Sequence, residues 1–333
     1  MREASCTLDQ GFSVFTVIGI SHSANTDQAE ANVPEQLISR MVAQDIVHIL
    51  EIVQVQEYHQ LTEVFTAPIM RLKTVDQQDL GGIMYSDSHS HLDGYTDEQM
   101  ATLLAEAKAR EVEIVIGVGS DLDRSEATIE VARRFPGITV AVGIHPWWAT
   151  PADLERGARL RQLLSQKEVA AIGEVGIDLE KNPSTGDVQW PVFEMQLGLA
   201  RELNMPMLLH CKGAKKEMQD RLRKESSVRG VMHGFAGTAV DAESWMELGL
   251  YIGIGMRTLT RNFGPEVQQA IQSIPLDRML LETDSSVRSY TGEENLQPTT
   301  VIEVAERVGR MHGVTGQEVG RLTTANLRAM LKR

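Results

Sequence analysis

Seven side chains that could hold metal ions are distributed between residues 89 and 284 of this 333-residue chain. They are five histidines and two carboxylates: His89, His91, His145, Glu174, His210, His233 and Asp284. Imidazole nitrogen and carboxylate oxygen are good ligands for Zn²⁺, Mn²⁺ and Fe²⁺, and carboxylates also bind Mg²⁺. A pair of such cations lowers the pKa of a water molecule and offsets charge on the attacking and leaving oxygens. The residue types therefore predict a site where two divalent cations activate water.

The spacing of these residues supports that prediction. In an extended segment, His89 and His91 face the same way, so both can bind one ion. Glu174 stands among small neighbours in the sequence Gly173-Glu174-Val175-Gly176. Its two oxygens can bridge two cations about 3.5–4 Å apart. We expect Glu174 to be that bridge.

Each of these residues also has a purely structural explanation. A single histidine at the end of a strand is usually a hydrogen-bonded structural residue, and Glu174 or Asp284 alone could cap a helix. Asp87 and Asp93, beside the histidine pair, are expected to fix the loop or support the ligands rather than to bind metal. The metal prediction therefore depends on all seven side chains meeting at one place.

The elements that position them form a regular alternation after residue 83. Short apolar runs are expected as strands at 83–87, 113–118, 139–144, 169–174, 206–210, 230–233, 250–254 and 279–284. Helical patterns separate or follow them near 96–110, 121–135, 152–167, 188–204, 214–226, 238–249, 264–273, 298–312 and 315–331. Near-continuous apolar strands between helices indicate a parallel sheet buried on both faces.

Eight such units in about 250 residues predict the α/β class and a (β/α)₈ TIM barrel. A doubly wound open sheet is the alternative, but eight repeats favour closure. Barrel enzymes carry their chemistry at the carboxyl ends of the strands, where all seven side chains fall. Two fragments, Gly117-Val118-Gly119 and Gly253-Ile254-Gly255, suggest a dinucleotide loop, but neither continues to a third glycine at the required offset.

Six short motifs resemble the TatD family of metal-dependent hydrolases and deoxyribonucleases, which are amidohydrolase-like barrels. They are 87–93 (DSHSHLD), 142–146 (VGIHP), 172–178 (IGEVGID), 206–210 (PMLLH), 232–237 (MHGFAG) and 275–284 (PLDRMLLETD). Each motif is weak alone, but their order at successive strand ends is specific. The resemblance covers about three quarters of the chain.

The resemblance implies a role for each residue. One metal would be held by His89, His91, Glu174 and Asp284, and a second by Glu174, His210 and His233. His145 would contact the scissile phosphate or assist proton transfer, and Asp284 would activate the attacking water. Members of the family are phosphodiesterases, often 3′→5′ exonucleases on DNA, that use Mg²⁺, Mn²⁺ or Zn²⁺.

The chain departs from the family pattern where substrate would bind. Cys211-Lys212 replaces the usual arginine after the fifth strand, and Lys212 can meet a phosphate only as a point charge. Arg257 follows the seventh strand, where it could reach a nucleic-acid backbone. Trp147 and Trp148 could equally stack on a base or pack their loop. Ser285 to Arg288 and Leu179-Glu180 replace other family residues, so substrate identity stays open.

Residues 1–83 lie outside the resemblance and carry 11 acidic and 4 basic residues, which gives them half of the net charge of −14. We expect an N-terminal extension or small α/β module that could bind a protein partner, and a barrel from 84 to 333. The acidity argues against a surface that coats nucleic acid. The two cysteines, Cys6 and Cys211, are expected as free thiols, Cys211 packing away from the face of His210.

The start of the sequence does not resemble a signal peptide, and no apolar run reaches the length of a membrane helix. A cytoplasmic enzyme without membrane attachment is therefore expected. Two other functions remain open. One is a hydrolase of a different ester or amide bond that uses the same metals, and the other is a barrel whose main role is to bind a partner through residues 1–83.

Overall fold

The computed structural model describes residues 85–225, 228–260, 265–286 and 296–332. The expected appendage at 1–83 lies outside the described residues, as do the first two residues of the first expected strand and Val287 and Arg288.

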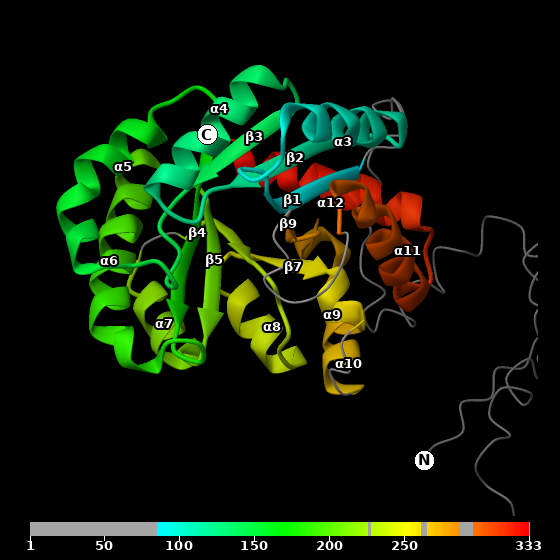
Figure 1. Cartoon of the computed structure of the whole chain (residues 1–333). Helices are drawn as coiled ribbons and strands as arrows, with labels where there is room; N and C mark the ends of the chain where they lie inside the picture. Colours follow the sequence, from blue (N-terminus) through cyan, green and yellow to red (C-terminus); the bar gives the residue numbers. More distant parts are fainter. Residues whose placement is uncertain (1–84, 226–227, 261–264, 287–295, 333) are drawn as a thin grey trace, which may run out of the picture. The chain divides into compact units, whose positions relative to one another are not determined.

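A single parallel sheet forms the centre of the barrel (Figure 1). Its strands are β1 (Tyr85–His91), β2 (Val112–Val118), β3 (Ile138–Val142), β4 (Val169–Asp178), β5 (Met207–Lys212), β6 (Gly230–Met232), β7 (Tyr251–Gly255), β8 (Met279–Glu282) and β9 (Ser285–Ser286). The strands from β1 to β8 pair in chain order, each with the next. This order is the consequence of right-handed β–α–β connections repeated along the chain.

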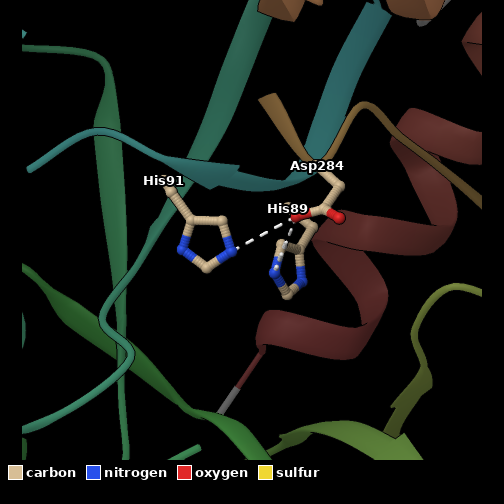
Figure 2. Close-up of side chains that lie close together, drawn as sticks. All are labelled: His89, His91 and Asp284. Carbon is tan, nitrogen blue, oxygen red and sulfur yellow. Dashed lines mark ion pairs between the residues drawn. The ribbon is translucent and has the colours of Figure 1, made fainter. Parts of the chain in front are cut away.

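The segment from Met279 to Ser286 closes the sheet, because its first part pairs with β7 and its last part pairs with β1. β8 pairs with β7, and β9, two residues further on, pairs with β1 so that His91 faces Ser286. Between them, the amide of Asp284 donates a hydrogen bond to the carbonyl oxygen of His89 at 2.8 Å. Asp284 is thereby placed next to the histidine pair of β1 (Figure 2). The predicted closed barrel is confirmed.

Helices surround the sheet and follow the predicted alternation. They are α3 (Asp97–Ala109), α4 (Leu122–Arg134), α5 (Gly157–Leu164), α6 (Gly186–Leu203), α7 (Lys215–Leu222), α8 (Ala239–Met246), α9 (Met256–Thr260), α10 (Pro265–Ser273), α11 (Val301–His312) and α12 (Gly316–Leu331). Short 3₁₀ turns cover Pro151–Arg156, Pro183–Thr185, Leu276–Arg278 and Pro298–Thr300. None of the helices in these described parts of the chain is both long and apolar enough to cross a bilayer.

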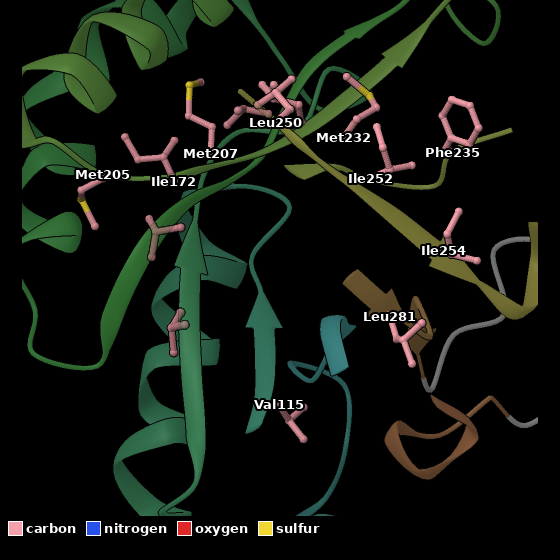
Figure 3. Packing of buried hydrophobic residues seen from close by; sticks show 14 of the residues in the cluster. Val115, Ile172, Met205, Met207, Met232, Phe235, Leu250, Ile252, Ile254 and Leu281 are labelled. Carbon is pink, nitrogen blue, oxygen red and sulfur yellow. The ribbon is translucent and has the colours of Figure 1, made fainter. Parts of the chain in front are cut away.

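Two apolar clusters bury the faces of the strands, which explains their near-continuous hydrophobic sequence. The larger cluster lies between strands and helices and includes Ile172, Met207 and Ile252 (Figure 3). The smaller one fills the barrel with residues of six strands and with Leu327 and Met330 of α12. The barrel is therefore a packed core.

The C-terminal helix α12 covers the amino ends of the strands. Thr324 Oγ1 donates a hydrogen bond to the Oγ of Ser86, the second residue of β1. The side-chain amide of Asn326 donates to the carbonyl oxygen of Met279, where β8 begins. The carboxyl ends of the strands are the opposite end of the barrel, and the predicted ligands lie there.

Candidate metal centre

The structure brings all seven predicted side chains into one cluster. Three overlapping groups have ligand atoms within 4.8 Å of one another: His89, His91 and Asp284; His89, Glu174 and His233; and His145, Glu174 and His210. The strand ends explain this convergence, because the residues belong to β1, β4 and β5 or lie within three residues of the ends of β3, β6 and β8. The cluster exists because the barrel closes.

The first group joins the two ends of the closed sheet (Figure 2). Asp284 Oδ1 lies 3.2 Å from His91 Nε2 and 3.9 Å from His89 Nε2. Asp284 has a φ of +53°, a left-handed conformation that aspartate adopts more readily than most residues. The expected same-side orientation of His89 and His91 is thus present, and the turn after β8 directs a carboxylate toward it.

Glu174 is the centre of the whole cluster and is 3% exposed. Its Oε2 lies 3.3 Å from His89 Nε2. Its Oε1 lies 2.8 Å from His210 Nδ1, 3.3 Å from His145 Nε2 and 3.8 Å from His233 Nε2. The two carboxylate oxygens therefore face different sets of imidazoles, which is the arrangement that a bridging ligand requires.

A glycine makes this approach possible. Gly176 has a φ of +152°, and a Cβ atom there would lie 1.8 Å from the carbonyl oxygen of His210 on β5. Only a residue without a side chain lets β4 run this close to β5. The glycine that follows Glu174 by two residues therefore sets the distance between Glu174 and His210.

The hydrogen bonding of His89 fits a cation. Both of its ring nitrogens are buried, and apart from the contacts of Nε2 with Glu174 and Asp284 neither has a hydrogen-bond partner among the described residues. A buried polar atom without a partner costs free energy unless something binds it. Its nearest neighbours are carboxylates and other imidazoles, which are the donors that transition-metal cations prefer.

The charge states also suit metal binding. Burial opposes ionisation of Glu174, but the imidazoles of His145 and His89 outweigh it and hold the pKa of Glu174 well below its usual range. Burial lowers the pKa of His89 and of His145. Burial opposes protonation of His91, His210 and His233 as well, but the carboxylates beside them raise the pKa of all three, that of His233 to about 10. Without a cation the centre therefore holds protonated imidazoles beside the ionised carboxylate, and a cation would bind by displacing those protons.

Two buried carboxylates that sequence reasoning missed stand behind the histidines. Asp178 Oδ2 lies 3.0 Å from His210 Nε2 and accepts a hydrogen bond from the indole of Trp147 at 2.5 Å. Glu282 Oε2 lies 2.9 Å from His233 Nδ1. The sequence carries a signal for both, because Asp178 follows Glu174 by four residues and Glu282 precedes Asp284 by two, but the interval alone does not reveal that these carboxylates are buried behind the histidines.

Asp87 also has a supporting role, as expected. It is fully buried and accepts hydrogen bonds from the backbone amides of His89 and Thr283 and from the hydroxyl groups of Ser90 and Thr283. It contacts no imidazole in these bonds and instead ties β1 to the turn that carries Asp284.

A cavity of about 450 Å³ opens over the cluster. Four basic side chains line it in this acidic protein: Arg124, Lys181, Lys212 and Arg257. Lys212 lies where the sequence places it, at the end of β5. The guanidinium of Arg257 lies against Asp284 Oδ2, so Arg257 contacts the predicted catalytic carboxylate itself.

The two tryptophans differ in their surroundings. Trp147 is half-buried, donates its hydrogen bond to Asp178 and contacts the ring of His145 edge-on. Trp148 is 41% exposed at the edge of the cavity, with the guanidinium carbon of Arg124 4.7 Å from its ring centroid. Both indoles line the cavity, but Trp147 is held by its hydrogen bond to Asp178, and Trp148 is the more exposed of the two.

Comparison with known proteins gives a consistent result. A family model described as TatD related DNase matches residues 86–332. The chain is 31% identical over 255 residues to the uncharacterized metal-dependent hydrolase YabD of Bacillus subtilis, covering 75% of this chain and 99% of that protein. It is 37% identical over 191 residues to the 3′-5′ ssDNA/RNA exonuclease TatD of Cronobacter sakazakii, covering 57% and 73%.

The fold is shared with a solved structure. The crystal structure of YJJV, a TatD homologue from Escherichia coli K12, has a TM-score of 0.66 at 24% identity and covers 75% of this chain and 98% of that one. Fold, cluster and sequence similarity agree, and the chain belongs to the TatD family of metal-dependent hydrolases.

Proposed function

We propose that this protein is a metal-dependent phosphodiesterase that hydrolyses nucleic acid, with DNA as the first candidate substrate and a 3′→5′ exonuclease mode. One observation carries the proposal: four basic side chains surround the cluster of carboxylates and imidazoles in a chain of net charge −14. Five carboxylates line the same cavity, so the basic side chains together with bound cations would supply the positive charge that attracts an anionic substrate, which the rest of the surface repels. A phosphodiester is such a substrate.

The cluster divides into two sets of ligands that share Glu174. His89, His91 and Asp284 with Glu174 would hold one divalent cation, and His210 and His233 with Glu174 would hold a second. Mg²⁺, Mn²⁺ and Zn²⁺ all suit these donors, with the imidazoles favouring the latter two. Bound together, such cations supply the charge that lowers the pKa of a water molecule and offsets charge on the phosphate.

The protein supplies the proton transfer and the orientation. Asp284 would accept a proton from the attacking water through Oδ1, while Arg257 restrains Oδ2 and keeps the carboxylate turned toward β1. His145 approaches Oε1 of Glu174, whereas His89 approaches Oε2. From this position His145 would contact the phosphate or donate a proton. Lys212 would bind a phosphate as a point charge, and Arg257 would contact the sugar-phosphate backbone of a bound nucleic acid.

A relative supports the choice of substrate. The Cronobacter sakazakii protein bears the name 3′-5′ ssDNA/RNA exonuclease, and the exposed Trp148 at the edge of the cavity could stack on an unpaired base. Of the departures from the family pattern, Lys212 and Glu180 line the cavity and would adjust substrate choice, whereas Cys211 and Leu179 pack against the larger apolar cluster. Hydrolysis of another ester or amide bond would use the same centre.

Product analysis on defined oligonucleotides tests the proposal. Metal-free protein is loaded with Mg²⁺, Mn²⁺ or Zn²⁺ in turn and incubated with 5′-labelled single-stranded and double-stranded DNA. We expect stepwise shortening from the 3′ end. Asp284→Asn should reduce the rate by about 10²–10⁴-fold, because asparagine keeps the left-handed backbone but cannot accept the proton.

The matched control is Asp153→Asn, which removes a buried carboxylate that caps a 3₁₀ turn and lines no part of the cavity. The proposed phosphodiesterase activity would be refuted if the metal-loaded protein shortened no oligonucleotide. It would also be refuted if the Asp284→Asn variant had the native rate. Hydrolysis of a carboxylic ester by the same preparation would then identify the alternative hydrolase.

A further inference from the structure

Glu282 is the last residue of β8 and is 2% exposed, yet neither the motif nor the proposed mechanism gives it a role. Its Oε1 accepts a hydrogen bond from the backbone amide of Gly234 at 2.8 Å. Its Oε2 lies 2.9 Å from His233 Nδ1. Apart from this contact, neither Oε2 nor Nδ1 has a hydrogen-bond partner among the described residues. The carboxylate is therefore committed to His233 and to the residue after it.

The other side of His233 faces the cluster. Its Nε2 lies 3.8 Å from Glu174 Oε1, and its ring stacks on His89 with centroids 3.7 Å apart. A carboxylate at Nδ1 keeps the ring proton on that nitrogen, so the lone pair of Nε2 stays directed at Glu174. The contact thus fixes both the orientation of the ring and the nitrogen that can bind a cation.

Room for Glu282 comes from the neighbouring strand. A Cβ atom on Gly253 would lie 2.4 Å from Glu282 Oε2, and one on Gly255 would lie 3.3 Å from Glu282 Cγ. These are the two glycines of the Gly253-Ile254-Gly255 fragment, which the dinucleotide interpretation could not explain. Because neither glycine has a side chain, space remains beside β7, and the Glu282 carboxylate fills it.

We propose that Glu282 is a positioning residue for His233 and that Gly253 is a glycine because it must admit the Glu282 carboxylate. This inference depends on the proposed function only in that His233 is taken as a metal ligand. The carboxylate holds Nδ1, and through it Nε2, in the form and direction needed to bind the second cation. The affinity of the site formed by His210, His233 and Glu174 for a cation therefore depends partly on Gly253 of β7 and Glu282 of β8.

The test is calorimetric titration of Mn²⁺ into metal-free protein, with bound metal counted by mass spectrometry. Glu282→Gln preserves shape and the bond from Gly234, but its amide can donate to Nδ1 and so favours the proton on Nε2. We expect one of two Mn²⁺ sites to weaken by about 10–100-fold, the usual effect of losing a carboxylate behind a ligating histidine. The other site should keep its affinity within about twofold.

Gly253→Ala is the second variant, because it displaces the carboxylate without removing it. It should weaken the same site in the native background and have no further effect in Glu282→Gln, since the two changes act through one group. Controls are Glu225→Gln, a largely buried acid paired with Arg221 outside the cavity, and Gly198→Ala, where an added Cβ meets no atom within 4 Å. Both should bind Mn²⁺ as native protein does.

Three outcomes would overturn the inference: native protein that holds fewer than two ions, Glu282→Gln that holds both with native affinity, or Gly253→Ala that weakens binding equally in both backgrounds. None of these measurements uses a substrate. Native protein that binds two Mn²⁺ ions but cleaves no phosphodiester would refute the proposed function alone and leave the role of Glu282 to the titration.

Discussion

At the scale of single residues, the site is organised around what each polar atom contacts. Glu174 divides its two oxygens between opposite sets of imidazoles, whereas Asp178 and Glu282 hold His210 and His233 from behind. Carboxylates in such supporting positions orient ligands and adjust their basicity. The cation affinity of the centre therefore depends on residues that would not touch the metal.

Trp148 gives a prediction about substrate. Trp148→Ala should raise KM for single-stranded oligonucleotides by about 5- to 150-fold, because loss of a stacking surface costs about 1–3 kcal/mol per base. The value of kcat should change by less than twofold, since Trp148 lies outside the metal cluster. Steady-state kinetics measure both.

Leu154→Ala is the matched control, because Leu154 is a similarly exposed large apolar side chain that does not line the cavity. It should leave both constants unchanged. An unchanged KM in Trp148→Ala would mean that the substrate passes the exposed indole without contact.

Cys211 gives a prediction about reactivity. Burial raises the pKa of its thiol to about 12, so only a very small fraction is thiolate at pH 8. Because the thiolate is the reactive form, a disulfide reagent should modify Cys211 about 10³-fold more slowly in native protein than in denaturant. A Cys6→Ser variant isolates the signal, and absorbance of the released thiol measures it.

Rapid modification of that variant in the native state would contradict the packing role of Cys211. The expected packing itself is observed, since Cys211 lies against the larger apolar cluster.

Sequence reasoning identified the side chains that cluster but not the carboxylates that support them. The seven predicted side chains were identifiable because metal-binding residue types recurred at the ends of strands. Asp178 and Glu282 were missed because an acidic residue at an even interval is ordinary until its burial is known. The pairing of Arg257 with Asp284 was also beyond reach, because it depends on how two separate turns orient their side chains.

At the scale of elements, Gly176 gives a prediction about stability. Gly176→Ala should lower the free energy of unfolding by about 3 kcal/mol or more, because the residue has a positive φ and its Cβ would overlap the carbonyl oxygen of His210. Urea denaturation measures the change. Metal binding should fall as well, since β4 and β5 must separate.

Gly198→Ala in the interior of α6 is the control and should raise stability by about 0.5–1 kcal/mol. A Gly176→Ala variant as stable as native protein would show that the strands can move apart without cost.

The alternation of strands and helices was predictable because burial on both faces leaves apolar runs in the sequence. The ends of the elements were less so. The helix expected at 152–167 is a 3₁₀ turn, Pro151–Arg156, followed by α5, Gly157–Leu164. The last expected strand, 279–284, ends as β8 at Glu282, and pairing resumes in β9. Hydrogen bonding across the closing barrel decides the end of β8, whereas local hydrogen bonds between Thr150 and Asp153 fix the 3₁₀ turn.

At the scale of the whole molecule, residues 84–333 are proposed as one folding unit. A shortened protein that begins at Met84 should remain folded, with a melting temperature within a few degrees of the full chain. It should also bind Mn²⁺ as the full chain does, because the described ligands lie at or after His89. Circular dichroism and calorimetry measure both properties.

Aggregation of the shortened protein would mean that residues 1–83 complete its core. If it folds but loses a binding partner captured by the full chain, residues 1–83 would be the docking segment.

The segment from Met279 to Ser286 both closes the barrel and delivers Glu282 and Asp284. During synthesis, a chain that has emerged only as far as β7 has an open sheet and an incomplete set of ligands. Catalytic competence should therefore arrive late, after more than four fifths of the 333 residues have been made. A hydrolase assembled in this order would lack its complete cluster of imidazoles and carboxylates for most of the time that it is attached to the ribosome.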